Sequence, residues 1–202
     1  KARREGSLTA ALMPRSPLGA EAAHFLIGGA MRLAEKGDLA EAEDAFRQAL
    51  AIDPTLPDGY YGLGLLALSV QQYDMARGML EHAVKLAPRA AAYHNALGRM
   101  HKAEHRLEDA ERCYLRALEL DPGLTAARVS LGLLYRETRR PHDAVEAHRE
   151  ALARDPRFLE AHVNLVNALR DARDPTLVKA VYESLIERHP AVAELHYFYA
   201  TL

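Results

Sequence analysis

The string "HKAEH", residues 101–105, has a spacing with which two histidines can hold a zinc ion while a glutamate acts as a base. His101 and His105 would be the ligands, and Glu104 would activate a water molecule for hydrolysis. The chain offers another role for His101, because the equivalent places of a repeated pattern, described below, hold leucine, alanine or tyrosine. We therefore predict that His101 packs internally, and we expect no metal site.

Other side chains that could do chemistry are few. Cys113 is the only cysteine, which excludes an internal disulfide and a multi-cysteine metal site. Neither a G-x-S-x-G nucleophile motif nor a P-loop occurs, and "GLGLL" at 62–66 lacks the spacing of a phosphate-binding loop. The aromatic run at 197–199 is more typical of a packing face than of a base-stacking platform. We expect no catalytic residue and no cofactor.

The composition excludes further classes of function. The chain has 202 residues, of which 49% are hydrophobic and 27% charged, so it can bury a core. Its net charge of −2 lacks the basic field of a nucleic-acid binder, and we expect no nucleic-acid partner. No apolar run reaches the roughly 18 residues that cross a bilayer, and we place the protein in the cytoplasm.

The first residue is Lys1, so we expect a piece of a longer chain. Glu5 and Pro14 interrupt the early apolar stretch, which makes residues 1–22 a poor signal peptide. We expect this segment to be a linker or to pack on the rest of the chain.

Five prolines recur at intervals of 34 residues, namely Pro54, Pro88, Pro122, Pro156 and Pro190. A fixed period of this length is typical of stacked supersecondary units. Because proline cannot continue a helix, each one is expected to end a helix and turn the chain into the next unit. The predicted units are 23–56, 57–90, 91–124, 125–158 and 159–192, with the start of a sixth at 193–202.

Each unit reads as two helices of about 14 residues with apolar places at helical spacing, separated by a short polar turn. Leu-Gly pairs recur in the first helices, as at Gly64, Gly98 and Gly132, and small residues recur in the second, as at Ala76 and Ala110. Because glycine costs about 1 kcal/mol in a helix, we expect these glycines to lie opposite the alanines, where the two helices cross. Phe46, Leu80, Tyr114 and Tyr182 are expected to fill the space between units.

The helix starts also carry signals. Pro141 and Pro175 occupy the same place in successive units, where a missing N–H does no harm to a starting helix. Asp38 and Asp174 each precede a second helix, and we expect both to cap it through their side chains.

Residues 23–202 resemble the tetratricopeptide repeat. The resemblance rests on Leu-Gly in the first helix, on alanine followed by an aromatic residue or leucine and then a second alanine in the second helix, and on a closing proline, all at a period of 34. The resemblance implies an all-α fold, an α-solenoid with a right-handed superhelix of stacked helical hairpins. One departure is the fourth place of each unit, where the family has tryptophan and this chain has Leu26, Tyr60, His94, Arg128 and His162.

In this resemblance the first helices line a concave face that binds a peptide or partner protein. The candidate partner-binding residues are Ile27, Met31, Tyr61, Leu65, Asn95, Arg99, Lys102, Leu133, Arg136, Asn167 and Arg170. The early part of this face is apolar and the later part basic, which suits a partner with an apolar anchor and an acidic end. Alternatively, some of the apolar residues pack against neighbouring helices.

Two ligand patterns of the family do not fit. The places of a Lys/Asn clamp for a terminal carboxylate hold Ile27, Met31 and Gly62, and only Asn164 matches an asparagine ladder.

Two functions remain open. The first is a non-catalytic interaction scaffold. The second is a recognition or assembly domain of a larger enzyme, such as a glycosyltransferase, sulfotransferase or hydroxylase. The last residues place Leu195, Phe198, Tyr199 and Leu202 at helical spacing with no second helix to cover them, so we also expect self-association through this end.

Overall fold

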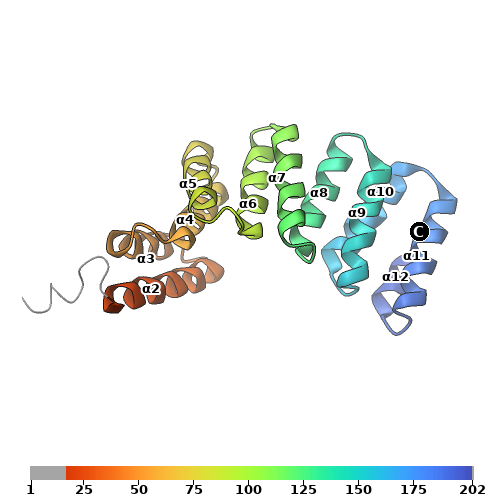
Figure 1. Ribbon diagram of the computed structural model, residues 1–202. Coiled ribbons are helices and arrows are strands. Elements are labelled where there is room, and N and C mark those ends of the chain that lie inside the picture. The colour runs from red at the N-terminus through yellow and green to blue at the C-terminus, as the bar shows by residue number, and fades with distance from the viewer. Residues whose placement is uncertain (1–16, 202) are drawn as a thin grey trace, which may run out of the picture. The chain divides into compact units, whose positions relative to one another are not determined.

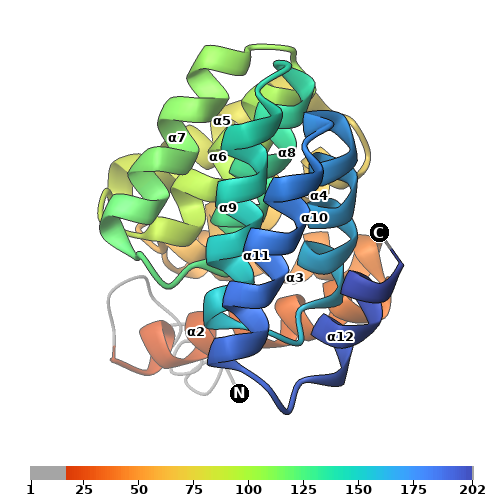
Figure 2. The same ribbon diagram turned by 90° about the vertical axis from the view of Figure 1, so that its right-hand side faces the viewer.

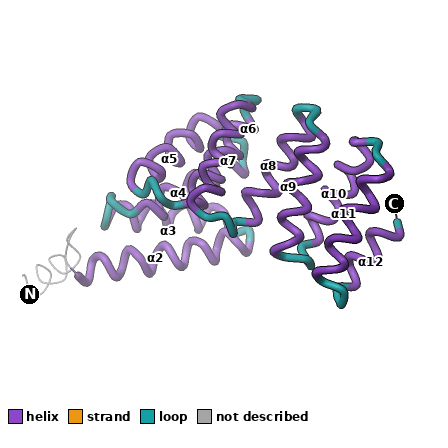
Figure 3. Tube along the Cα trace, turned by 45° about the vertical axis from the view of Figure 1, so that its right-hand side comes forward, coloured by secondary structure: helices purple, strands orange, loops and turns teal. Residues whose placement is uncertain are grey.

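The structure, a computed structural model, describes residues 17–201, and every regular element in them is a helix (Figure 3). The helices are α2 (Pro17–Lys36), α3 (Leu39–Ile52), α4 (Pro57–Ser69), α5 (Tyr73–Leu86), α6 (Ala91–Ala103), α7 (Leu107–Leu120), α8 (Thr125–Glu137), α9 (Pro141–Arg154), α10 (Leu159–Ala172), α11 (Pro175–Arg188) and α12 (Ala193–Ala200). The prediction of an all-α fold of helical hairpins is confirmed. None of these helices is long and apolar enough to span a membrane.

The chain divides into two compact units, residues 1–100 and 101–202. In the first, α2 packs on α3 and α4 on α5 as successive antiparallel pairs (Figure 1). In the second, α7, α9 and α11 form one layer, and α8 and α10 form the other (Figure 2). The first helix α2 begins at Pro17, inside the segment 1–22 that we expected to precede the repeats, and residues 1–16 lie outside the described part.

The five periodic prolines end the second helices as predicted. The helices α3, α5, α7, α9 and α11 each end two residues before one of them, and the next first helix begins three residues after it. The proline carbonyl has a second role, because it accepts a hydrogen bond from the side chain six residues later. The donors are Tyr60 to Pro54 (3.1 Å), His94 to Pro88 (2.9 Å), Arg128 to Pro122 (3.0 Å), His162 to Pro156 (2.8 Å) and His196 to Pro190 (3.0 Å).

These donors explain the departures at the fourth place of the repeat. From the second unit onward, a polar ring or guanidinium at this place ties the first helix to the turn that precedes it, whereas the first unit has Leu26 there. The residue types differ, but all of them present an N–H or O–H at the end of a flat or planar group.

The turns inside the hairpins share one conformation at the same place of the repeat. Gly37, Gln71, His105, Arg139 and Arg173 all have positive φ, between 54° and 90°. In the first four of these turns, the residue after the left-handed one donates its N–H to the carbonyl five residues earlier, as in Gln72 to Ala67 (2.8 Å) and Arg140 to Tyr135 (2.7 Å). This arrangement satisfies carbonyls that the helix end would otherwise leave free, and it stabilises a left-handed residue even where that residue is not glycine.

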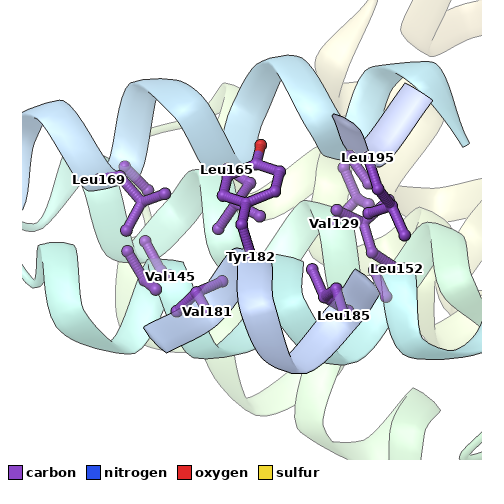
Figure 4. Packing of buried hydrophobic residues seen from close by; sticks show 13 residues of the cluster. Val129, Val145, Leu152, Leu165, Leu169, Val181, Tyr182, Leu185 and Leu195 are labelled. Atoms are coloured by element: carbon purple, nitrogen blue, oxygen red, sulfur yellow. The ribbon is translucent and has the colours of Figure 1, made fainter. Parts of the chain in front are cut away.

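The core of the second unit is a cluster of aliphatic side chains around Tyr182 (Figure 4). Leu165, Tyr182 and Leu185 are 1% exposed or less, and they join α10 to α11. A matching cluster in the first unit surrounds Phe46.

Gly64 and Gly132 lie against large side chains of the second helices rather than against the alanines, which corrects our expectation for these two glycines. A Cβ on Gly64 would stand 2.7 Å from Leu80, and a Cβ on Gly132 would stand 2.5 Å from the ring of His148. His148 holds the place that Phe46, Leu80, Tyr114 and Tyr182 hold in the other units. Glycine is needed at these places because a large buried side chain of the second helix occupies the space that a Cβ would take.

Only one of the two expected capping aspartates caps its helix. Asp174 accepts hydrogen bonds from the N–H groups of Thr176 (2.9 Å) and Leu177 (3.2 Å). Asp38 precedes α3 but makes no such bond. The backbone explains the difference, because Asp174 has the extended conformation that aims a side chain at the first turn (φ −117°, ψ 100°), whereas Asp38 does not (φ −79°, ψ 62°).

The apolar stripe of the last helix is largely covered, which corrects the prediction that it is bare. Leu195 is 0% exposed, the ring of Phe198 stacks on His162 at 4.8 Å, and the ring of Tyr199 stacks on Tyr182 at 5.6 Å. The neighbouring helices α10 and α11 therefore cover this face of α12. The fourth predicted residue of the stripe, Leu202, lies outside the described residues.

Candidate functional site

The expected partner-binding residues occupy the fifth, ninth and twelfth places of the first helices. The structure distributes them over two faces, one in each unit. The first-unit face carries Ile27, Met31, Tyr61, Leu65, Asn95 and Arg99, and the second-unit face carries Lys102, Leu133, Arg136, Asn167 and Arg170.

Two residues of the first-unit face belong to its core. Ile27 is 6% exposed, and its Cδ1 atom lies 3.3 Å from the position of a Cβ on Gly59. Met31 is half-buried and packs against the same cluster. The alternative that some apolar residues pack against neighbouring helices therefore holds for Ile27 and in part for Met31.

An aromatic pair forms the centre of the first-unit face. The rings of Tyr61 and Tyr93 stack with centroids 4.7 Å apart and 29° between their planes. The Tyr93 hydroxyl donates a hydrogen bond of 2.5 Å to Asp58. Burial raises the pKa of both phenols, and the hydrogen bond to Asp58 raises that of Tyr93 further, so both stay protonated at neutral pH.

The rest of this face is mixed in character. Leu65 is half-buried, and Arg99 is exposed. The positive charge of Arg99 lowers the pKa of Tyr61 in part, so it lies close enough to that phenol for its charge to act. Asn95 is half-buried, with a side-chain oxygen that has no hydrogen-bond partner in the described part of the chain.

Ion pairs between successive repeats order the second-unit face. The Nζ atom of Lys102 lies 3.3 Å from a carboxylate oxygen of Glu137, and the Nε atom of Arg136 lies 2.8 Å from one of Asp171. Both pairs join a cation at the twelfth place to a carboxylate 35 residues later. Because these side chains are partly exposed, each pair contributes little to stability, on the order of 1 kcal/mol or less.

The other predicted residues of this face differ in exposure. Leu133 is half-buried and packs against the core cluster. Asn167 is half-buried, and Arg170 is exposed at the end of α10. Asn164, the one match to an asparagine ladder, is buried.

The motifs that could have done chemistry take structural places. His101 is buried on α6, as predicted, and His105 lies in the following left-handed turn with a φ of 58°. In residues 17–201, His, Cys, Asp and Glu form no group of three or more that could hold a metal ion. Burial raises the pKa of the Cys113 thiol, and the neighbouring Asp109 raises it further, which disfavours the reactive thiolate. "GLGLL" is an internal stretch of α4.

Sequence reasoning missed the partners of the predicted residues. Tyr93 and Asp58 were not considered, although they are 35 residues apart, the interval that also joins Lys102 to Glu137. That recurring interval is a signal that the sequence contained. No such signal marked His148, because a histidine in a column of leucine and aromatic residues looks like an ordinary substitution.

These features define the class of the protein, a stack of 34-residue helical hairpins with a first-helix face available for contacts. The comparisons give the family. Models of the tetratricopeptide repeat match residues 33–100, 91–124, and 5–57 together with 129–177. The chain belongs to the tetratricopeptide repeat family. A search of curated proteins found no match.

Solved structures show the same fold. One from Pseudomonas aeruginosa, described as a functional characterization of pilF, has a TM-score of 0.73 at 21% identity, over 83% of this chain and 77% of that one. The structure of YrrB, described as a protein of this repeat type with an unusual peptide-binding site, has a TM-score of 0.59 at 20% identity, over 85% and 89%. An O-GlcNAc transferase mutant from Thermobaculum terrenum has a TM-score of 0.64 at 27% identity, over 67% of this chain and 26% of that one.

Proposed function

We propose that this chain is a non-catalytic interaction scaffold that binds a peptide or partner protein on the faces of its first helices. The repeat family points to protein–protein interaction, and a structurally similar protein, YrrB, is described as having a peptide-binding site. The observation that carries the proposal is the half-buried ring of Tyr61, which stacks on the buried Tyr93 and lies close to the exposed Arg99. Asp58 holds Tyr93 in place, so the accessible aromatic surface is that of Tyr61. Such a surface offers an apolar contact and a positive charge to the same segment of a partner.

A peptide selection tests this proposal. A random peptide library is selected on the immobilised protein, and the affinity of the selected peptides is then measured for Tyr61→Ala. We expect a loss of about tenfold or more, because truncating a central aromatic contact typically costs 1–2 kcal/mol or more of binding free energy. Leu86→Ala is the control, since Leu86 is an exposed apolar residue at the end of the second helix α5. Equal affinities for the two variants would contradict the proposal.

A second candidate function is that of a recognition or assembly domain in a larger enzyme. This hypothesis is favoured by the structural match to an O-GlcNAc transferase, because the match covers only 26% of the transferase chain. The complete reading frame tests it, because a catalytic domain next to these repeats is expected under this hypothesis and not under the first.

Two further expectations remain proposals. We propose the cytoplasm as the compartment, which cell fractionation with an antibody to the native protein tests. We also propose contact between copies of the chain through α12, where Tyr197 is 65% exposed.

A further inference from the structure

The end of the second-unit face contains a cavity that its arginines dominate. The cavity has a volume of about 570 Å³ and is lined by Arg136, Arg139, Pro141, Arg170, Asp171 and Arg173. Positive charges on this lining outnumber negative ones by three. Pro141 is the first residue of α9, so the positive end of that helix also forms part of the wall.

The repeat brings these arginines together. Arg139 and Arg173 are the left-handed residues of two successive hairpin turns, with φ of 58° and 54°. Arg136 and Arg170 hold the twelfth place of the same two repeats, three residues before those turns. Because successive repeats stack, four guanidinium groups from two repeats share one wall.

Most of this positive charge has no counterpart within the described residues. Asp171 pairs with Arg136 at 2.8 Å, whereas Arg139, Arg170 and Arg173 have no ion-pair or hydrogen-bond partner for their side chains in residues 17–201. Neighbouring like charges repel one another, so this arrangement favours a bound anion.

The ion pairs of this face indicate what that anion is. Lys102 and Arg136 each take a carboxylate 35 residues later. Guanidinium groups bind carboxylate and phosphate oxygens in a planar, two-pronged geometry that other anions match less well.

We propose that this arginine cavity, formed by Arg136, Arg139, Arg170 and Arg173, binds the oxyanions of an acidic segment of a partner polypeptide, carboxylate or phosphoryl. The inference rests on the proposed scaffold function for the identity of the ligand as a partner. It places the acidic part of that ligand, which the basic residues of the sequence had suggested, in a defined cavity at the hairpin turns. Two of the residues that form this cavity, Arg139 and Arg173, were not among the candidates selected from the sequence.

Fluorescence anisotropy with defined peptides tests this site. The probes are a fluorescent Glu-rich peptide, its counterpart with phosphoserine in place of Glu, and its counterpart with Gln. The cavity variant is Arg139→Glu with Arg173→Glu, which leaves the Arg136–Asp171 pair intact. The control is Arg157→Glu with Arg188→Glu, an equal change of charge at exposed residues of the same unit outside the cavity.

We expect the wild type and the control to bind an acidic probe, the Gln probe to bind far more weakly, and the cavity variant to lose about tenfold or more in affinity at low salt. Tighter binding of the phosphoserine probe identifies phosphoryl as the preferred group, and equal or tighter binding of the Glu probe identifies carboxylate. An equal loss in the two charge-reversed variants, or no binding of either acidic probe, would overturn the inference. Far-UV circular dichroism checks that both variants fold, and Arg139→Gln with Arg173→Gln serves as a milder second variant.

The scaffold proposal can fail or succeed separately. If selected peptides still lose affinity on Tyr61→Ala while the acidic probes ignore the cavity variant, only the present inference is wrong. If Tyr61→Ala changes nothing while the cavity variant releases the acidic probe, the anion site holds and the proposed first-unit face does not.

Discussion

His148 places a polar imidazole ring in the apolar core of the second unit. It is 0% exposed, and neither ring nitrogen has a hydrogen-bond partner within residues 17–201. Burial, with a smaller contribution from the positive charge of Arg136, lowers its pKa to about 4. The folded protein therefore holds this imidazole neutral where the unfolded chain would protonate it.

This group makes stability depend on pH. Its folded pKa lies below its unfolded value of 6.5, so its full contribution to stability is present above that value and is lost as pH falls toward 4. The loss amounts to about 3 kcal/mol across that range. We predict that His148→Phe flattens the melting-temperature profile between pH 7 and pH 4.5, measured by circular dichroism. His142→Gln, an exposed histidine of the same helix, is expected to leave the profile unchanged, and equal profiles for His148→Phe and the wild type would contradict this account.

Gly132 and His148 form a second test at this scale. A methyl group on Gly132 would stand 2.5 Å from the imidazole ring, so we predict that Gly132→Ala lowers the free energy of unfolding by about 1–3 kcal/mol. In a His148→Ala background the same change should cost far less, and chemical denaturation of all four combinations measures the coupling. Gly78→Ala on α5, where nothing lies within 4 Å, is the control and is expected to stabilise by up to about 1 kcal/mol. Additive effects of the two core changes would show that the ring and the glycine do not meet.

At the scale of the elements, two local features fix the ends of the helices. A proline carbonyl accepts from a side chain at the start of the next first helix, as from Tyr60 to Pro54. A left-handed residue closes the turn inside each hairpin, as at Arg139. Neither device depends on one residue type, so the helix boundaries keep their period while the residues at these places vary.

The two aspartates before second helices provide a prediction for an element. We expect Asp174→Ala to lower the melting temperature, because it leaves the N–H groups of Thr176 and Leu177 without their acceptor. Asp38→Ala is the matched control, since Asp38 holds the same place but makes no capping bond. Thermal unfolding followed by circular dichroism compares the two. Equal shifts would mean that the cap at α11 contributes nothing of its own.

At the scale of the whole molecule, the protein is built from contacts between neighbouring repeats. The pairs Tyr93–Asp58, Lys102–Glu137 and Arg136–Asp171 each join places 35 residues apart. Such a stack derives its stability from each repeat and its neighbours rather than from one central core. A binding face built from the same places of successive repeats follows from this construction.

Contact between copies belongs to this scale as well. Leu195, Phe198 and Tyr199 are engaged by their own chain, so self-association through α12 must use Tyr197, which is 65% exposed. We predict that Tyr197→Asp lowers the mass measured by light scattering at high protein concentration, because it places a charge on the one large apolar side chain that this helix exposes among residues 193–201. A mass that is monomeric in the wild type and unchanged in the variant would contradict self-association.

The sequence by itself determined the architecture, because each of its signals acts over a short distance along the chain. The prolines at a period of 34 end the second helices, the Leu-Gly and Ala columns identify the repeat family, and Asp174 caps its helix as expected. His101 was assigned to packing because its equivalents are apolar, and it is buried. Local conformation and a fixed period are sufficient for these conclusions.

Only the tertiary structure decided which side chains meet. It placed Gly64 against Leu80 rather than Ala76, buried Ile27 in the core, and covered the face of α12 that the sequence left bare. It also brought Arg139 and Arg173 to one cavity. These outcomes depend on the angle at which two helices cross and on the backbone angles of the turn residues. Because the same sequence period is compatible with many crossing angles, the period does not specify which side chains meet. Those contacts are decided by packing in three dimensions.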